Sequence, residues 1–217
     1  MAEVRVKFCG LQSAADVAAA VAAGADAVGF VLVPGSRRQV DPAAVRRWLG
    51  GVTPFVTPVA VCADQSLADV VRLVEAAGVR TVQLAGAEDP DYAARLAAMG
   101  LRVLKVLHMD GPCAWQAGRG YRDCSGFVLD AASQFGPGGS GQAFPWQWAA
   151  QAVAGLPAPV ILAGGLRAGN VARAVAEVRP YAVDVSSGVE ENGQKTLAAM
   201  RSFCRAVREG AVAHDDS

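Results

Sequence analysis

The stretch "AADVAAAVAAGADAVGFVLV" (residues 14–33) predicts one helix followed by one strand, and this pair of elements indicates the fold class. Its first half is Ala-rich and typical of a buried helix, whereas "AVGFV" (27–31) is a short apolar run typical of a strand. Asp16, Asp26 and two glycines interrupt the apolar residues, so the stretch does not fit a membrane-spanning helix.

The same unit repeats along the chain. Continuous apolar runs, typical of strands buried on both faces, alternate with Ala-rich runs typical of helices. We expect strands at 4–8, 27–31, 56–61, 80–84, 102–107, 126–129, 159–163 and 182–185. We expect helices at 13–23, 42–49, 66–77, 90–99, about 112–118, 145–154, 169–178 and 195–208.

Eight strand–helix units predict an α/β fold, a (β/α)8 TIM barrel. We expect a single domain over residues 1–210 and a flexible tail at 211–217. A doubly wound open sheet is the alternative, but no Gly-x-Gly-x-x-Gly follows the first strand, which disfavours a dinucleotide-binding version. Pro112, Gly118 and Gly120 make the fifth helix the weakest.

The composition sets limits on partners and location. The chain of 217 residues is 53% hydrophobic and 18% charged with a net charge of +0, which argues against nucleic acid as a partner. Its five cysteines are odd in number and lack a C-x-x-C spacing. We therefore expect a reduced, cytoplasmic protein without a structural metal site. We also expect no membrane contact, and both a monomer and a homodimer stay open.

Barrel enzymes place their active sites at the carboxyl ends of the strands, which directs attention to "KFCG" (7–10). Side chains alternate along a strand, so Lys7 and Cys9 share a face. A thiol with a pKa of about 8.5 needs a nearby cation to act as a base near neutral pH. Lys7 could supply that charge or contact a substrate instead, and Cys9 could alternatively be a small buried apolar residue.

Asp130 ends the apolar strand "GFVLDA" (126–131), where it could be catalytic, a helix N-cap or a buried ion-pair partner. The following segment "AASQFGPGGSGQAF" (131–144) is long and Gly-rich, as functional loops often are. Arg37 and Arg38 follow the second strand, as a solvated pair or as ligands of a carboxylate. The direction of Lys105 stays open, and His108 is either a polar loop residue or a ligand.

Three Gly-rich segments follow late strands: "GGSG" (138–141), "AGGL" (163–166) and "SSGV" (186–189). Bare backbone amides can approach an anion closely, and the last two loops of such barrels commonly bind phosphate. The alternative is that these glycines only allow the chain to form ordinary turns. The candidate phosphate ligands are Gly139, Ser140, Gly164, Gly165, Ser186, Ser187 and Gly188.

Taken in order, "KFCG", "GADAVGFVLVPGSRRQV", "VQLAG", "GFVLDA", "GGSG", "VILAGGL" and "VDVSSGVE" resemble the motifs of the phosphoribosylanthranilate isomerase family. The resemblance covers residues 4–208. It implies a cofactor-free Amadori rearrangement of N-(5'-phosphoribosyl)anthranilate, a step of tryptophan biosynthesis. It also implies that Cys9 is the general base, that Asp130 is the general acid and that Arg38 lies near the anthranilate carboxylate. Lys7 and Gln83 are further candidates for contact with the phosphorylated sugar-amine substrate.

The sequence departs from the family pattern at several positions. Ala85 replaces a His and Gln39 a Tyr, whereas Gln142, Pro145 and Thr196 stand where the family has Lys, Asp and Asp. Two alternatives therefore stay open. One is a divergent paralogue that isomerises another phosphoribosyl amine, and the other is a non-catalytic barrel that binds a phosphorylated ligand.

Overall fold

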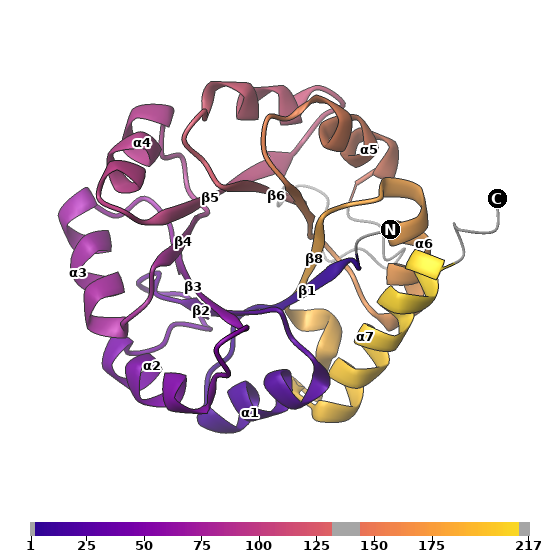
Figure 1. Ribbon diagram of the computed structural model, residues 1–217, viewed down its shortest axis with the longest axis horizontal. Helices are drawn as coiled ribbons and strands as arrows, with labels where there is room; N and C mark the ends of the chain where they lie inside the picture. Colours follow the sequence, from indigo (N-terminus) through magenta and orange to yellow (C-terminus); the bar gives the residue numbers. More distant parts are fainter. Residues whose placement is uncertain (1–2, 132–143, 213–217) are drawn as a thin grey trace.

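The computed structural model describes residues 3–131 and 144–212, and it contains a closed barrel of eight parallel strands. Each strand pairs with the next, and β1 closes the ring against β8 (Figure 1). The strands are β1 (Arg5–Phe8), β2 (Ala27–Val31), β3 (Thr57–Cys62), β4 (Thr81–Leu84), β5 (Arg102–Met109), β6 (Gly126–Ala131), β7 (Val160–Leu162) and β8 (Ala182–Val185). The predicted barrel is confirmed, and the open-sheet alternative is wrong because β1 and β8 are paired.

Helices surround the ring of strands, as Figure 1 shows. They are α1 (Ala14–Ala23), α2 (Pro42–Trp48), α3 (Leu67–Ala77), α4 (Pro90–Ala98), α5 (Trp146–Gly155), α6 (Ala168–Val178) and α7 (Leu197–Val212). Short 3-10 helices, η1 (Leu49–Gly51), η2 (Ala114–Gly120) and η4 (Ser187–Val189), and a small hairpin of β9 (Glu190–Glu191) and β10 (Gln194–Lys195) complete the described elements. Within these residues no helix combines the length and the apolar character needed to cross a bilayer.

Local signals in the sequence fix where helices begin and end. The Ser13 hydroxyl accepts a hydrogen bond from the backbone N–H of Asp16 at 3.1 Å and so caps α1. Ser66 caps α3 in the same way. Gly24 and Gly78 end these two helices in the left-handed conformation, with φ of 94° and 71°.

The fifth repeat contains a 3-10 helix rather than the predicted α-helix. η2 covers residues 114–120, and Gly118 packs so closely that a Cβ there would lie 2.7 Å from Leu156 and 2.9 Å from Leu107. Glycines lower helix propensity, and this close contact favours a short, tight element. At the other end of the chain, α7 continues through Val212, and residues 213–217 of the predicted tail lie outside the described residues.

The alternation of side chains divides the apolar residues into two cores. Between strands and helices lies the larger core, which includes the fully buried rings of Phe8, Phe30 and Phe127. A smaller cluster fills the barrel interior and contains Val106, Val128, Ile161, Ala163 and Ala182. Because Phe8 points outward to the helices, its neighbours Lys7 and Cys9 point inward.

Candidate active site

A pocket opens at the carboxyl ends of the strands, where the fold class predicts one. Cys9 at the end of β1 and Asp130 at the end of β6 both line it, from strands that are not neighbours in the ring. A larger, mainly apolar groove lies between α5, α6 and α7, but its described lining contains none of the predicted site residues. The chemistry therefore points to the pocket at the strand ends.

Cys9 is held by backbone pairing between β1 and β8. Its N–H donates to the carbonyl oxygen of Val185 at 2.8 Å, which continues the ladder in which Lys7 is the partner of Asp184. Lys7 Nζ lies 2.7 Å from Asp184 Oδ2, and both side chains are almost completely buried inside the barrel. A buried ion pair therefore lies next to the thiol, because Lys7 and Cys9 are two residues apart on the same face of the chain.

Burial and charge act in opposite directions on these groups. Burial raises the pKa of the Cys9 thiol, and the Lys7 ammonium opposes that rise. Burial alone would lower the pKa of Lys7, but the Asp184 carboxylate and Cys9 outweigh it, so the pKa of Lys7 lies above its ordinary value. Lys7 is therefore a permanent cation beside the thiol.

Asp130 is a carboxyl group whose pKa lies above its ordinary value. Burial raises its pKa, and the carboxylate of Asp184 adds to this, while the N–H of Ala131 and the imidazole of His108 oppose it. Asp130 Oδ1 accepts the Ala131 N–H at 2.8 Å, and His108 is its register partner on β5. Such a group can donate a proton to a substrate that enters the pocket.

The loops after β7 and β8 bring bare backbone to the pocket. Gly164 and Gly165 have positive φ angles, and a Cβ on Gly188 would overlap the carbonyl oxygen of Leu166. These glycines line the pocket together with Ser186 and Ser187. Gly139 and Ser140, the other two predicted phosphate ligands, lie outside the described residues.

Arg38 lies at the rim of the barrel and forms an ion pair with Glu190. Its Nη2 lies 2.9 Å from Glu190 Oε1, and Lys195 Nζ reaches the same oxygen at 3.1 Å while donating to the carbonyl of Ser186 at 2.8 Å. Burial by itself raises the pKa of Glu190, but hydrogen bonds from Arg38 and Lys195 outweigh it and lower the pKa. This cluster ties the loop after β2 to the loop after β8.

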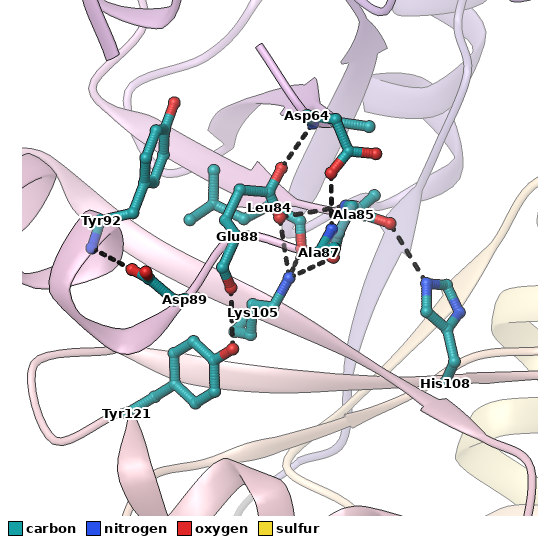
Figure 2. A network of polar contacts seen from close by, with 12 residues as sticks. Asp64, Leu84, Ala85, Ala87, Glu88, Asp89, Tyr92, Lys105, His108 and Tyr121 are labelled. Carbon is teal, nitrogen blue, oxygen red and sulfur yellow. Dashed lines mark hydrogen bonds and ion pairs between the residues drawn. The ribbon is translucent and has the colours of Figure 1, made fainter. Parts of the chain in front are cut away.

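Lys105 points away from the barrel interior, which settles the direction that the sequence left open. Its Nζ lies 2.8 Å from Glu88 Oε2 and 2.6 Å from the carbonyl oxygen of Gly86 (Figure 2). Glu88 Oε1 also accepts the N–H of Asp64 at 2.9 Å. One buried carboxylate thus joins the loops after β3 and β4, both at the pocket end of the barrel.

The wall of the pocket on the β4–β5 side carries further polar atoms. His108 Nε2 lies 3.1 Å from the carbonyl oxygen of Ala85 (Figure 2), and both residues line the pocket. Gln83 Oε1 and Asp184 Oδ1 are buried and have no hydrogen-bond partner among the residues that the structure describes. Two buried acceptors without donors favour a ligand that carries hydroxyl groups.

Comparison with known proteins shows the family. The family model of N-(5'-phosphoribosyl)anthranilate (PRA) isomerase matches residues 6–206. The chain belongs to the PRA isomerase family. A relative named N-(5'-phosphoribosyl)anthranilate isomerase, from Chromohalobacter salexigens, is 45% identical over 208 residues, which are 95% of each chain.

Solved PRA isomerase structures share the fold over nearly the whole chain. One of them, in complex with reduced 1-(o-carboxyphenylamino)-1-deoxyribulose 5-phosphate, is 30% identical with a TM-score of 0.83, and the match covers 94% of this chain and 98% of that one. Another shows monomers generated from the dimeric enzyme of Thermotoga maritima, at 29% identity and a TM-score of 0.82 over the same shares. Both support the barrel assignment independently of the sequence pattern.

The structure brings most of the sequence-predicted candidates to one place. Among the described residues, those that line the pocket are Cys9, Gln83, Asp130, Gly164, Gly165, Ser186, Ser187 and Gly188. Lys7 and Arg38 are not among the described residues that line the pocket. Lys7 lies deeper in the barrel than Cys9, and Arg38 lies at the rim. In the described part of the chain no group of three or more His, Cys, Asp or Glu side chains is placed to hold a metal ion.

Sequence reasoning missed Asp184, Glu190 and Lys195 as parts of this region. Asp184 lies within "VDVSSGVE", but an acid in the middle of an apolar strand does not by itself indicate a functional role. Lys195 lies in the β9–β10 hairpin, and nothing in the local sequence indicates that its ammonium reaches Glu190.

Proposed function

We propose that this chain converts N-(5'-phosphoribosyl)anthranilate into 1-(2-carboxyphenylamino)-1-deoxyribulose 5-phosphate in tryptophan biosynthesis. One observation carries the proposal: in a member of the PRA isomerase family, Cys9 and Asp130 line one pocket from β1 and β6, beside the Gly-rich loops after β7 and β8. An acid and a base that reach a bound sugar from different sides can open its ring and move its proton.

In the proposed reaction, Asp130 donates its proton to the ring oxygen of the furanose. The bond between C1' and that oxygen breaks, and the nitrogen lone pair forms a C1'=N iminium ion. The Cys9 thiolate then removes the proton from C2', and the electron pair of that C–H bond forms a C1'=C2' double bond and neutralises the iminium nitrogen. The resulting enolamine gains a proton at C1' and loses one from the C2' hydroxyl, which gives the ketone without any external oxidant or reductant.

The proposed binding roles follow the positions of the groups. The substrate phosphate lies on the backbone amides of Gly164, Gly165 and Gly188 with the hydroxyls of Ser186 and Ser187. The buried Oε1 of Gln83, which has no partner within the described residues, accepts a hydrogen bond from a sugar hydroxyl. Arg38 receives the anthranilate carboxylate by exchanging it for the carboxylate of Glu190, which it holds in this structure.

Partners and location follow from the same proposal. The solved relative with a bound phosphorylated ligand supports a phosphorylated sugar amine as the substrate class. The dimeric relative supports a homodimer as one of the two expected states, beside a monomer. A biosynthetic step on a phosphorylated intermediate fits the cytoplasm.

A second candidate is the isomerisation of another phosphoribosyl amine. It is favoured by Ala85, which lines the pocket with a methyl group where the family resemblance leads one to expect a His. A smaller side chain leaves room for a differently substituted aglycone. The acid–base steps would be the same, since Cys9 and Asp130 act on the sugar.

The experiment that tests the proposal is turnover of freshly prepared N-(5'-phosphoribosyl)anthranilate, with the product identified by mass spectrometry. Conversion to a product of unchanged mass that reduces as a ketone supports it. A folded protein that leaves this substrate unchanged contradicts it. A panel of phosphoribosyl amines, measured beside it, then shows whether another aglycone gives a higher kcat/KM.

A further inference from the structure

Gly29 on β2 leaves open a small space inside the barrel that two reactive groups share. A Cβ built on Gly29 would lie 2.9 Å from Cys9 Sγ and 3.2 Å from Lys7 Nζ. The thiol and the ammonium therefore both lie over the bare Cα of this residue. Any side chain at position 29 would displace one of them.

The ammonium of Lys7 is fixed in this space by Asp184. The two residues are register partners on β1 and β8, and Lys7 Nζ lies 2.7 Å from Asp184 Oδ2. Both side chains are more than nine-tenths buried. A buried charge needs a partner, and this pairing explains why Lys7 remains a cation inside the barrel.

We propose that Lys7 is a positioning residue for Cys9: held by Asp184 over Gly29, its ammonium stabilises the thiolate form of the thiol rather than contacting the substrate. The inference rests on the proposed function only for its catalytic consequence. In the reaction proposed above, the thiolate is the form that removes the C2' proton. The sequence left both roles of Lys7 open, and the geometry favours this one.

The other charged groups around Cys9 also act on the pKa of its thiol. Asp184 faces Cys9 from β8, Lys195 faces it from the β9–β10 hairpin, and Asp130 lines the same pocket from β6. The two cations favour the thiolate, whereas the carboxylates oppose it. Lys7 lowers the pKa of the thiol more than Asp184 raises it. Removing both members of the pair should therefore raise the pKa of Cys9.

The test measures the pH dependence of Cys9 alkylation by iodoacetamide, with the modified peptides quantified by mass spectrometry. Only the thiolate reacts, so the profile reports the apparent pKa of Cys9 directly. Cys113 is exposed and serves as an internal reference in every sample. No substrate is present, so the result does not depend on whether the chain turns over N-(5'-phosphoribosyl)anthranilate.

Two variants and one matched control decide the outcome. Lys7→Met leaves the buried Asp184 carboxylate without its partner, which can prevent folding. The double variant Lys7→Met/Asp184→Asn removes both charges and avoids this problem. The control is Lys105→Met/Glu88→Gln, which removes another buried ion pair on the helix side of the barrel.

We expect both Lys7 variants to slow Cys9 alkylation at neutral pH by about tenfold or more, which corresponds to a shift of about one pKa unit. The single variant should show the larger shift. The control pair and Cys113 should keep the wild-type profile. A Cys9 profile that is unchanged in the double variant, or shifted equally in the control, would overturn the proposal.

Discussion

Gly188 after β8 lies so close to the carbonyl oxygen of Leu166 after β7 that no side-chain atom fits between them. The two loops proposed to hold the substrate phosphate therefore meet through bare backbone. This contact belongs to the tertiary fold, because Gly188 does not have a positive φ and local backbone strain does not require a glycine there.

Gly188→Ala should weaken substrate binding. The new methyl group would push the loops apart and misplace their amides, and hydrogen bonds to a charged group contribute about 1.5–3 kcal/mol each, so we expect KM to rise about tenfold to hundredfold. Steady-state kinetics measures this. Gly169→Ala is the matched control, since the nearest atom to its Cβ is 3.9 Å away and alanine favours helix α6. Equal effects of the two substitutions would contradict the assignment of the loops.

Asp130→Asn should lower activity and raise stability at neutral pH. Loss of a general acid typically costs about 10²–10⁴-fold in rate. Because burial raises the pKa of Asp130 in the folded state, its favourable contribution is complete below the unfolded pKa and is lost as the pH rises through the folded pKa. At neutral pH the buried carboxylate is therefore a penalty that asparagine removes.

Thermal unfolding at several pH values checks this second effect. The Tm of Asp130→Asn should exceed that of the wild type at neutral pH, and the difference should shrink as the pH falls toward the ordinary pKa of an aspartate. Asparagine retains the oxygen that accepts the Ala131 N–H, so that contact is kept. A variant less stable than the wild type at neutral pH would show that the ionised carboxylate stabilises the fold.

Lys105→Met should destabilise the barrel strongly. It leaves the Glu88 carboxylate buried without its cation, which typically costs about 3–5 kcal/mol. Since each kcal/mol shifts Tm by about 2–4 °C in a chain of this size, the Tm should fall by about 6–20 °C. Calorimetry measures it. The exposed pair of Arg72 and Asp69 provides the control, because Arg72→Met should lower the stability by no more than about 1 kcal/mol. A similar fall in Tm in both variants would argue against a special role for the buried pair.

Much of the fold follows from local sequence. The ends of every predicted strand lie within two residues of the observed ends, because the strands are short apolar runs. Several helices also carry their own end signals, such as Ser13 and Gly24 at α1. The position of Cys9 at a strand end, and its shared face with Lys7, also follow from the period of two along a strand.

Other features depend on contacts that sequence spacing does not contain. Arg38 meets Glu190 across 152 residues of chain, and the pairing exists only because the loops after β2 and β8 meet beside β1. Lys105 could face either side of its strand, since a period of two does not fix the phase. The run "AVGFV" does not indicate why residue 29 is a glycine, because Lys7 and Cys9 lie over it only when β1 and β2 pair.

The assignment of Cys9 and of the substrate is tested by the fluorescence decay of freshly prepared N-(5'-phosphoribosyl)anthranilate, followed for the wild type and for Cys9→Ser under the same conditions. Serine keeps the size of the side chain but is a far weaker base at neutral pH, so the fold should be retained. We expect rapid loss of the substrate with the wild type and a rate about 10²–10⁴-fold lower with Cys9→Ser. Near-equal rates for the two proteins would contradict the assignment of Cys9 as the base, and no loss with a folded wild type would contradict the proposed substrate.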